Sequence, residues 1–145
     1  MFGWVARLLG LSQSEAPAER EFFSSVAGVS HRNRDRTSRQ KIIREDVYAG
    51  MLLKLRLEDD NKFDKNAVAV ETPSGAQIGY LNSRLASDVR GWLAEGMPVV
   101  IRVDDVTGGD SDKPMRGVNI HVQVLARAPN PWDAPVPPAT PPGYW

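Results

Sequence analysis

A short polar run around one aromatic ring is the part of the chain best suited to binding chemistry. Residues 59–66 read Asp-Asp-Asn-Lys-Phe-Asp-Lys-Asn and precede an alternating apolar stretch. Asn and Asp favour turns, and a turn at a strand end holds its side chains on a rigid base. Phe63 could stack on a nucleobase, and Asp64 could accept a hydrogen bond from a sugar hydroxyl. The residues alone favour a structural interpretation, in which Phe63 plugs a barrel mouth and Asp64 and Asn66 bind backbone amides.

Catalytic and metal-binding patterns are missing from the sequence. The chain has no cysteine and only two histidines, and neither histidine lies in a nucleophile elbow, a zinc-binding helix or a phosphate-binding loop. His121 should lie on the wet face of a strand, and we interpret it as structural. The acidic pairs Asp104-Asp105 and Glu58-Asp60 lack a second cluster at metal-ligand spacing, so we interpret them as solvated. We therefore predict no enzymatic activity, no metal and no cofactor.

Charge is balanced overall but distributed unevenly. Lys plus Arg and Asp plus Glu each number 18, so the net charge is zero, which argues against a nonspecific polyanion binder. A local basic segment nevertheless contains Arg32, Arg34, Arg36, Arg39 and Lys41. These side chains would neutralise phosphates if the segment borders the 59–66 loop, and Arg84 could add to them; otherwise they form a solvated face.

Composition divides the chain into three parts. We predict an apolar N-terminal helix and linker over 1–20, one domain over 21–127, and a Pro-rich tail over 128–145 with seven of the 11 prolines. No apolar run is long enough to span a bilayer, and a signal peptide is not recognisable. We expect a cytoplasmic protein.

The pattern of the central part predicts six strands and two short helices. Strands are expected at 26–30, 51–57, 67–72, 77–81, 99–106 and 117–125. One helix should begin after Thr37 or Ser38, and the other should be capped by Asn82 or Ser83 and end at Gly96. This order suits a mainly β protein in which the six strands form an OB-like or SH3-like antiparallel barrel.

Several separated motifs resemble one family. They are Val-Ala-Gly-Val-Ser-His-Arg at 26–32, Thr-Ser-Arg-Gln at 37–40, Asp-Asn-Lys-Phe-Asp-Lys-Asn-Ala-Val-Ala-Val at 60–70, Gln-Ile-Gly-Tyr-Leu at 77–81 and Gly-Val at 117–118. Their order resembles the HIRAN domain over roughly residues 22–125. The resemblance implies an OB-like fold that binds the 3′ end of single-stranded DNA.

The resemblance also implies roles for individual residues. Phe63 stands where the family usually has a Tyr that stacks on the terminal base, and Asp64 stands where a carboxylate accepts a bond from the 3′ hydroxyl. Lys62 replaces the usual Pro, which loosens the loop. The candidate nucleic-acid-binding residues are Ser30, His31, Arg32, Arg34, Asn61, Lys62, Phe63, Asp64, Tyr80 and Arg84.

Two functions are compatible with these features. In the first, the chain binds single-stranded DNA, at its 3′ end, and targets a helicase, nuclease or other repair protein to damaged or replicating DNA. In the second, the barrel is purely structural and the chain is an assembly module, which self-associates through Phe2, Trp4, Leu8 and Leu9 and uses its Pro-rich tail as a second contact.

Overall fold

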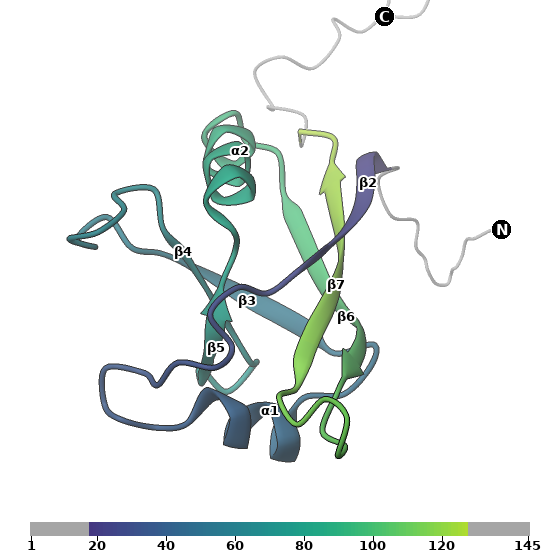
Figure 1. Ribbon diagram of the computed structural model, residues 1–145. Coiled ribbons are helices and arrows are strands. Elements are labelled where there is room, and N and C mark those ends of the chain that lie inside the picture. Colours follow the sequence, from purple (N-terminus) through teal and green to yellow (C-terminus); the bar gives the residue numbers. More distant parts are fainter. Residues whose placement is uncertain (1–17, 128–145) are drawn as a thin grey trace, which may run out of the picture.

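The computed structural model describes residues 18–127 and contains two helices and six strands in that range (Figure 1). The elements are β2 (Ala18–Ser25), α1 (Arg39–Asp46), β3 (Leu52–Leu57), β4 (Val68–Glu71), β5 (Gln77–Tyr80), α2 (Ser83–Ala94), β6 (Val99–Thr107) and β7 (Gly117–Leu125). The strands form one antiparallel sheet in the order β2-β7-β6-β3-β4-β5. The predicted mainly β, OB-like fold with two helices is confirmed, as a curled half-barrel.

The two edges of the sheet meet at one point just beyond β2. The Ala27 amide donates to the Tyr80 carbonyl at 2.7 Å, and the Tyr80 amide donates to the Ala27 carbonyl at 2.9 Å. Gly79 allows this approach, because a Cβ there would collide with the Ala27 carbonyl oxygen and the Val26 side chain. The half-barrel is therefore held closed at the strand that carries Tyr80.

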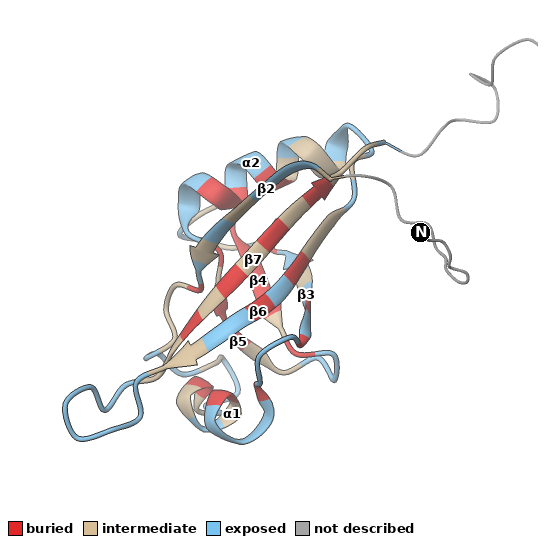
Figure 2. Ribbon diagram, turned by 90° about the vertical axis from the view of Figure 1, so that its right-hand side faces the viewer, coloured by how far each residue is buried: buried red, intermediate tan, exposed pale blue. Residues whose placement is uncertain are grey.

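The core lies inside the curl of the sheet. Strand β7 alternates strictly, with Val118, Ile120, Val122 and Val124 buried, and this alternation is visible along its ribbon in Figure 2. His121 lies on the opposite face, where its Nε2 is 2.7 Å from a carboxylate oxygen of Glu21. The prediction that His121 lies on the outer face is confirmed.

Both helices begin at capping residues that the sequence predicts. Ser38 Oγ accepts a hydrogen bond from the Lys41 amide at 3.1 Å, and Asn82 Oδ1 accepts one from the Leu85 amide at 2.9 Å. The two helices lie at opposite ends of the curled sheet (Figure 1). Helix α1 begins with Arg39 and Lys41 of the basic segment and lies against β5.

The first strand differs from the prediction. The strand is Ala18–Ser25, which pairs with β7, whereas residues 26–30 form a bridge and a turn in which Gly28 has a φ of 72°. Phe22 and Phe23 are adjacent and both apolar, so the sequence shows no alternation of apolar and polar residues at this point. In the structure, Phe22 packs on Trp92 and Phe23 is exposed. The predicted linker therefore contributes Ala18, Glu19 and Arg20 to a strand.

The predicted N-terminal helix and Pro-rich tail lie outside the described residues. Within 18–127, neither helix has the length and apolar character needed to cross a membrane.

Replacing Gly79 with Ala should lower the free energy of unfolding by about 1 to 3 kcal/mol, because the added methyl group has no space at the edge closure. Urea denaturation would measure the change. Gly91 is the matched control, since it is exposed on α2 and, apart from its chain neighbours and the nearby backbone of its own helix, nothing lies within 4 Å of an added Cβ. Gly91→Ala should be neutral or stabilising by up to about 1 kcal/mol; equal effects at both positions would contradict the steric argument.

Candidate nucleic-acid interface

The 59–66 loop is organised by the side chain of Asn61. Its Oδ1 accepts hydrogen bonds from the amides of Phe63 at 2.8 Å and Asp64 at 2.9 Å. Asp64 Oδ1 accepts in turn from the Asn66 amide at 2.9 Å. The Phe63 side chain is 100% exposed, so it does not plug the barrel, although Asp64 does bind a backbone amide of the turn. The loop thus presents a bare aromatic ring on a hydrogen-bonded base.

A buried carboxylate holds this loop against the sheet. Glu58 is only 6% exposed, and its Oε1 accepts from Asn61 Nδ2 and from the Tyr80 hydroxyl, both at 2.9 Å. Its Oε2 accepts from Arg56 Nη1 at 2.8 Å. The prediction that Glu58 is a solvated charge is therefore wrong. Arg56 and Asn61 lie within three residues of Glu58 in the sequence, and folding adds Tyr80 from β5, so the buried carboxylate is fully hydrogen-bonded.

The same contacts set the protonation of this cluster. Burial raises the pKa of Glu58, but hydrogen bonds from Asn61, Tyr80 and Arg56 and the charge of Arg56 outweigh it, so the pKa lies below its ordinary value of 4.5. Hydrogen bonding to Glu71, at 2.6 Å, is the main cause that raises the pKa of Arg56. Arg56 therefore carries its charge while bound to two carboxylates.

The basic segment is folded back onto β5. A turn at 33–36 is closed by the Arg36 amide, which donates to the Asn33 carbonyl at 2.8 Å, and Arg36 has a φ of 71°. Asn33 Nδ2 donates to the Gln77 carbonyl at 2.9 Å, which fixes the turn beside the strand that carries Tyr80. The segment borders the 59–66 loop, a relation that the sequence left open.

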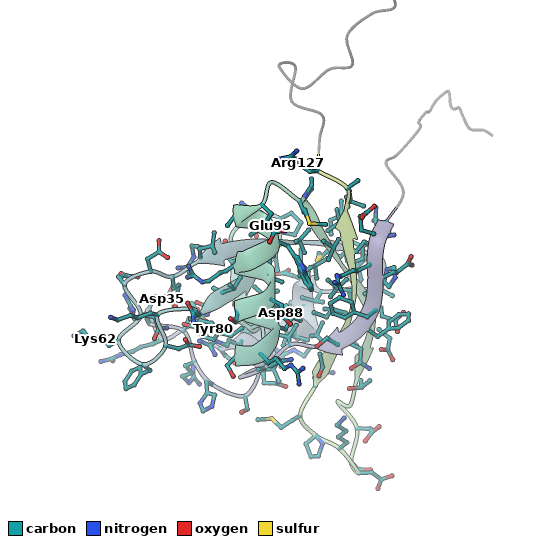
Figure 3. The ribbon with its side chains drawn as sticks, turned by 90° about the horizontal axis from the view of Figure 1, so that it is seen from above. Asp35, Lys62, Tyr80, Asp88, Glu95 and Arg127 are labelled. Carbon is teal, nitrogen blue, oxygen red and sulfur yellow. The ribbon has the colours of Figure 1, made fainter. Side chains whose placement is uncertain are left out.

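A groove of about 700 Å³ lies between these parts. It is lined by Arg32, Asn33, Arg34, Arg39, Arg56, Glu58, Asp60, Asn61, Lys62, Phe63, Gln77 and Tyr80. Five of these side chains are cationic and two are acidic, in a chain whose net charge is zero. Asp35, Lys62 and Tyr80 mark this side of the molecule in Figure 3. The groove has the size of a small-ligand site and a local positive charge.

Six of the predicted site residues line this groove, and four do not. Those that line it are Arg32, Arg34, Asn61, Lys62, Phe63 and Tyr80. Ser30 and His31 are exposed in the preceding turn, and Asp64 is half-buried beside Phe63 in the loop. Arg84 lines a different groove, between β2 and α2, together with Phe22 and Trp92.

Sequence reasoning missed part of the lining. Arg39 belongs to the predicted basic segment, but Asn33, Arg56, Glu58 and Gln77 were not among the candidates. Their only signal was position, since Arg56 and Glu58 immediately precede the loop and Gln77 precedes Tyr80 by three residues. Between residues 18 and 127, no cluster of three or more His, Asp or Glu side chains could hold a metal ion.

The curled sheet and the cationic groove define an OB-like binding module. The family model of the HIRAN domain matches residues 20–111, and the chain belongs to this family of DNA-binding modules. No curated relative matches the chain significantly.

Two solved structures support the fold assignment. The HIRAN domain of human HLTF is 17% identical, with a TM-score of 0.55 and coverage of 74% of this chain and 76% of that one. A protein from Lactobacillus plantarum is 18% identical, with a TM-score of 0.51 and coverage of 74% of this chain and 100% of that one. At this identity the likeness extends to the fold alone.

Replacing Glu58 with Ala should loosen the loop without unfolding the sheet. Asn61 Nδ2 and the Tyr80 hydroxyl lose their shared acceptor, so we expect a loss of about 1 to 3 kcal/mol in the free energy of unfolding. Amide exchange should quicken most at Phe63 and Asp64, whose N–H groups bind Asn61. Uniform acceleration that includes Val70 in β4 would contradict a local role.

The lowered pKa of Glu58 predicts a pH effect with a definite sign. Its stabilising contribution is present above the ordinary value of 4.5 and is lost as pH falls through the lower folded-state pKa. Between about pH 6 and pH 3.5, Glu58→Gln should therefore lose less unfolding free energy than the wild type in urea titrations. Glu45→Gln, which removes an exposed carboxylate paired with Arg44, is the control and should behave as the wild type.

Proposed function

We propose that this chain is a non-catalytic module that binds single-stranded DNA at its 3′ end and targets a partner protein to damaged or replicating DNA. The supporting observation is the groove itself: five cations and two aromatic rings are gathered in a chain without net charge. Cations bind phosphates and rings stack on bases, which together suit a single strand.

The two rings would take different positions against the strand. Phe63 is fully exposed and free to stack on the terminal base. Tyr80 directs its hydroxyl to Glu58 and has the Arg39 guanidinium 5.3 Å from its ring centroid, so it would offer ring surface and not its oxygen. Arg32, Arg34 and Lys62 are exposed around the groove, where they would contact the backbone of the strand.

End recognition is assigned to Asp64. One of its carboxylate oxygens binds the Asn66 amide, and the other has no hydrogen bond among the described residues. The second oxygen could accept a bond from a 3′ hydroxyl and would repel a 3′ phosphate. Ser30 and His31 lie in the turn that precedes Arg32 and would approach a longer strand.

The assembly alternative depends on residues 1–11 and 128–145, which lie outside the described residues. The partner, a helicase, nuclease or other repair protein, and the cytoplasmic location remain predictions. Deleting residues 1–11 would separate the alternatives, since it should abolish self-association in the assembly hypothesis and leave DNA binding intact in ours.

The decisive measurement is fluorescence anisotropy with a short single strand that ends in a free 3′ hydroxyl or a 3′ phosphate. The wild type should prefer the hydroxyl, and Phe63→Ala should weaken binding by roughly 1 to 3 kcal/mol through lost stacking. Asp64→Asn keeps an acceptor for the Asn66 amide but removes the charge, so it should reduce the discrimination between the two ends.

Arg84→Gln is the control, because Arg84 lines the other groove and should leave affinity near the wild-type value. If the strands with a 3′ hydroxyl and a 3′ phosphate bind equally well, the protein binds single strands without recognising their 3′ end. Absence of binding to either strand would reject the proposal in favour of assembly.

A further inference from the structure

One arginine in the groove is buried without an acidic partner. Arg39, the first residue of α1, is 6% exposed. Its Nε donates to Asn33 Oδ1 at 2.7 Å, its Nη1 donates to the Gly28 carbonyl at 2.8 Å, and its Cζ lies 5.3 Å from the Tyr80 ring centroid. Among the ion pairs within residues 18–127, none involves Arg39.

The positive charge of Arg39 is therefore buried without a neighbouring negative charge to compensate it. Burial of a charge is costly unless the charge is paired, and the oxygen acceptors of Arg39 are both neutral. Glu58, the buried acid nearby, is by contrast matched by Arg56. The first turn of α1 contains no acidic residue, so the positive end of the helix dipole adds to the guanidinium charge.

The guanidinium retains N–H donors for which no described residue supplies an acceptor. It has five N–H groups, of which the bonds to Asn33 and Gly28 use two. No nitrogen of Arg39 is both fully buried and without a hydrogen-bond partner; in the described part of the chain, that situation occurs at Arg90 Nε. Since Arg39 lines the groove, its remaining donors are accessible to a ligand there.

We propose that Arg39 forms an anion subsite that binds a phosphodiester of the strand whose terminal base stacks on Phe63. This inference rests on the proposed function and deepens it, because it separates one phosphate contact from the general basic character of the segment. A phosphate oxygen supplies the missing negative charge and accepts from the guanidinium fork. Arg36 and Lys41 belong to the same basic segment but are exposed and do not line the groove.

The acidic residues of the groove leave room for this contact. Glu58 is engaged by Arg56, Tyr80 and Asn61, and Asp60 is exposed on the loop. The absence of a side chain at Gly28 leaves space for the Arg39 guanidinium, because a Cβ at that position would lie 3.2 Å from Arg39 Nη1.

The test replaces the phosphodiesters near the 3′ end, one at a time, with neutral methylphosphonates. At one linkage the wild type should lose about tenfold or more in affinity, as expected for a lost charge-assisted contact. Arg39→Gln should bind the unmodified strand about tenfold more weakly than the wild type does. Placing a methylphosphonate at that linkage should weaken the binding of this variant little further. Arg36→Gln is the matched control and should keep the wild-type discrimination. Equal methylphosphonate penalties in the wild type and Arg39→Gln would overturn the assignment.

A second measurement needs no variant, in case Arg39→Gln does not fold. The Nε–H resonance of Arg39 in the wild-type protein should shift when the unmodified strand binds, and shift less with the methylphosphonate strand. A resonance that responds equally to both strands, or to neither, would reject the subsite.

Failure of the proposed function would be recognised separately. If the wild type binds no DNA, inorganic pyrophosphate becomes the probe. A rise in the wild-type melting temperature that is absent in Arg39→Gln would support an anion subsite without a DNA function. No rise in either protein would reject the subsite as well.

Discussion

The two hydrogen bonds between Ala27 and Tyr80 are the constraint on which the site depends. They join the segment after β2 to the opposite edge of the sheet and close the half-barrel. This closure places the basic turn beside β5, where Asn33 binds the Gln77 carbonyl. Without it, Arg32, Arg34 and Arg39 would follow one edge strand of an open sheet, apart from the aromatic loop between β3 and β4. A backbone contact that only Gly79 permits thus determines which side chains share a groove.

The charges of the groove are arranged by depth, with the carboxylate of Glu58 buried and most of the cations exposed. Glu58 binds the polar groups of Asn61, Tyr80 and Arg56 on its buried side, which leaves the exposed ring of Phe63 and the exposed cations toward solvent. A fully satisfied buried carboxylate is rigid, so the loop is held in shape before a ligand arrives. Preorganisation of this kind reduces the ordering cost of binding.

Local features were predictable from the sequence, and contacts between distant segments were not. Strand β7 and the caps at Ser38 and Asn82 depend on neighbouring residues, and the prediction was confirmed in each case. Strand β2 was misplaced because its inner face is defined by pairing with β7. Asn61, Lys62, Phe63 and Tyr80 were predicted as binding residues and line the groove. The burial of Glu58 was not predicted, because it depends on Tyr80, a partner that only the fold brings to it.

The basic segment shows why a charge run in a sequence is not yet a site. Its five cations are equivalent by composition, but only Arg39 is buried, and it occupies the helix end where a positive charge is least favourable. Stability alone would favour an acidic residue in the first turn of α1. Natural proteins break such local rules mainly where function compensates for them. The unfavourable placement of Arg39 is therefore itself an argument that the groove evolved around an anion.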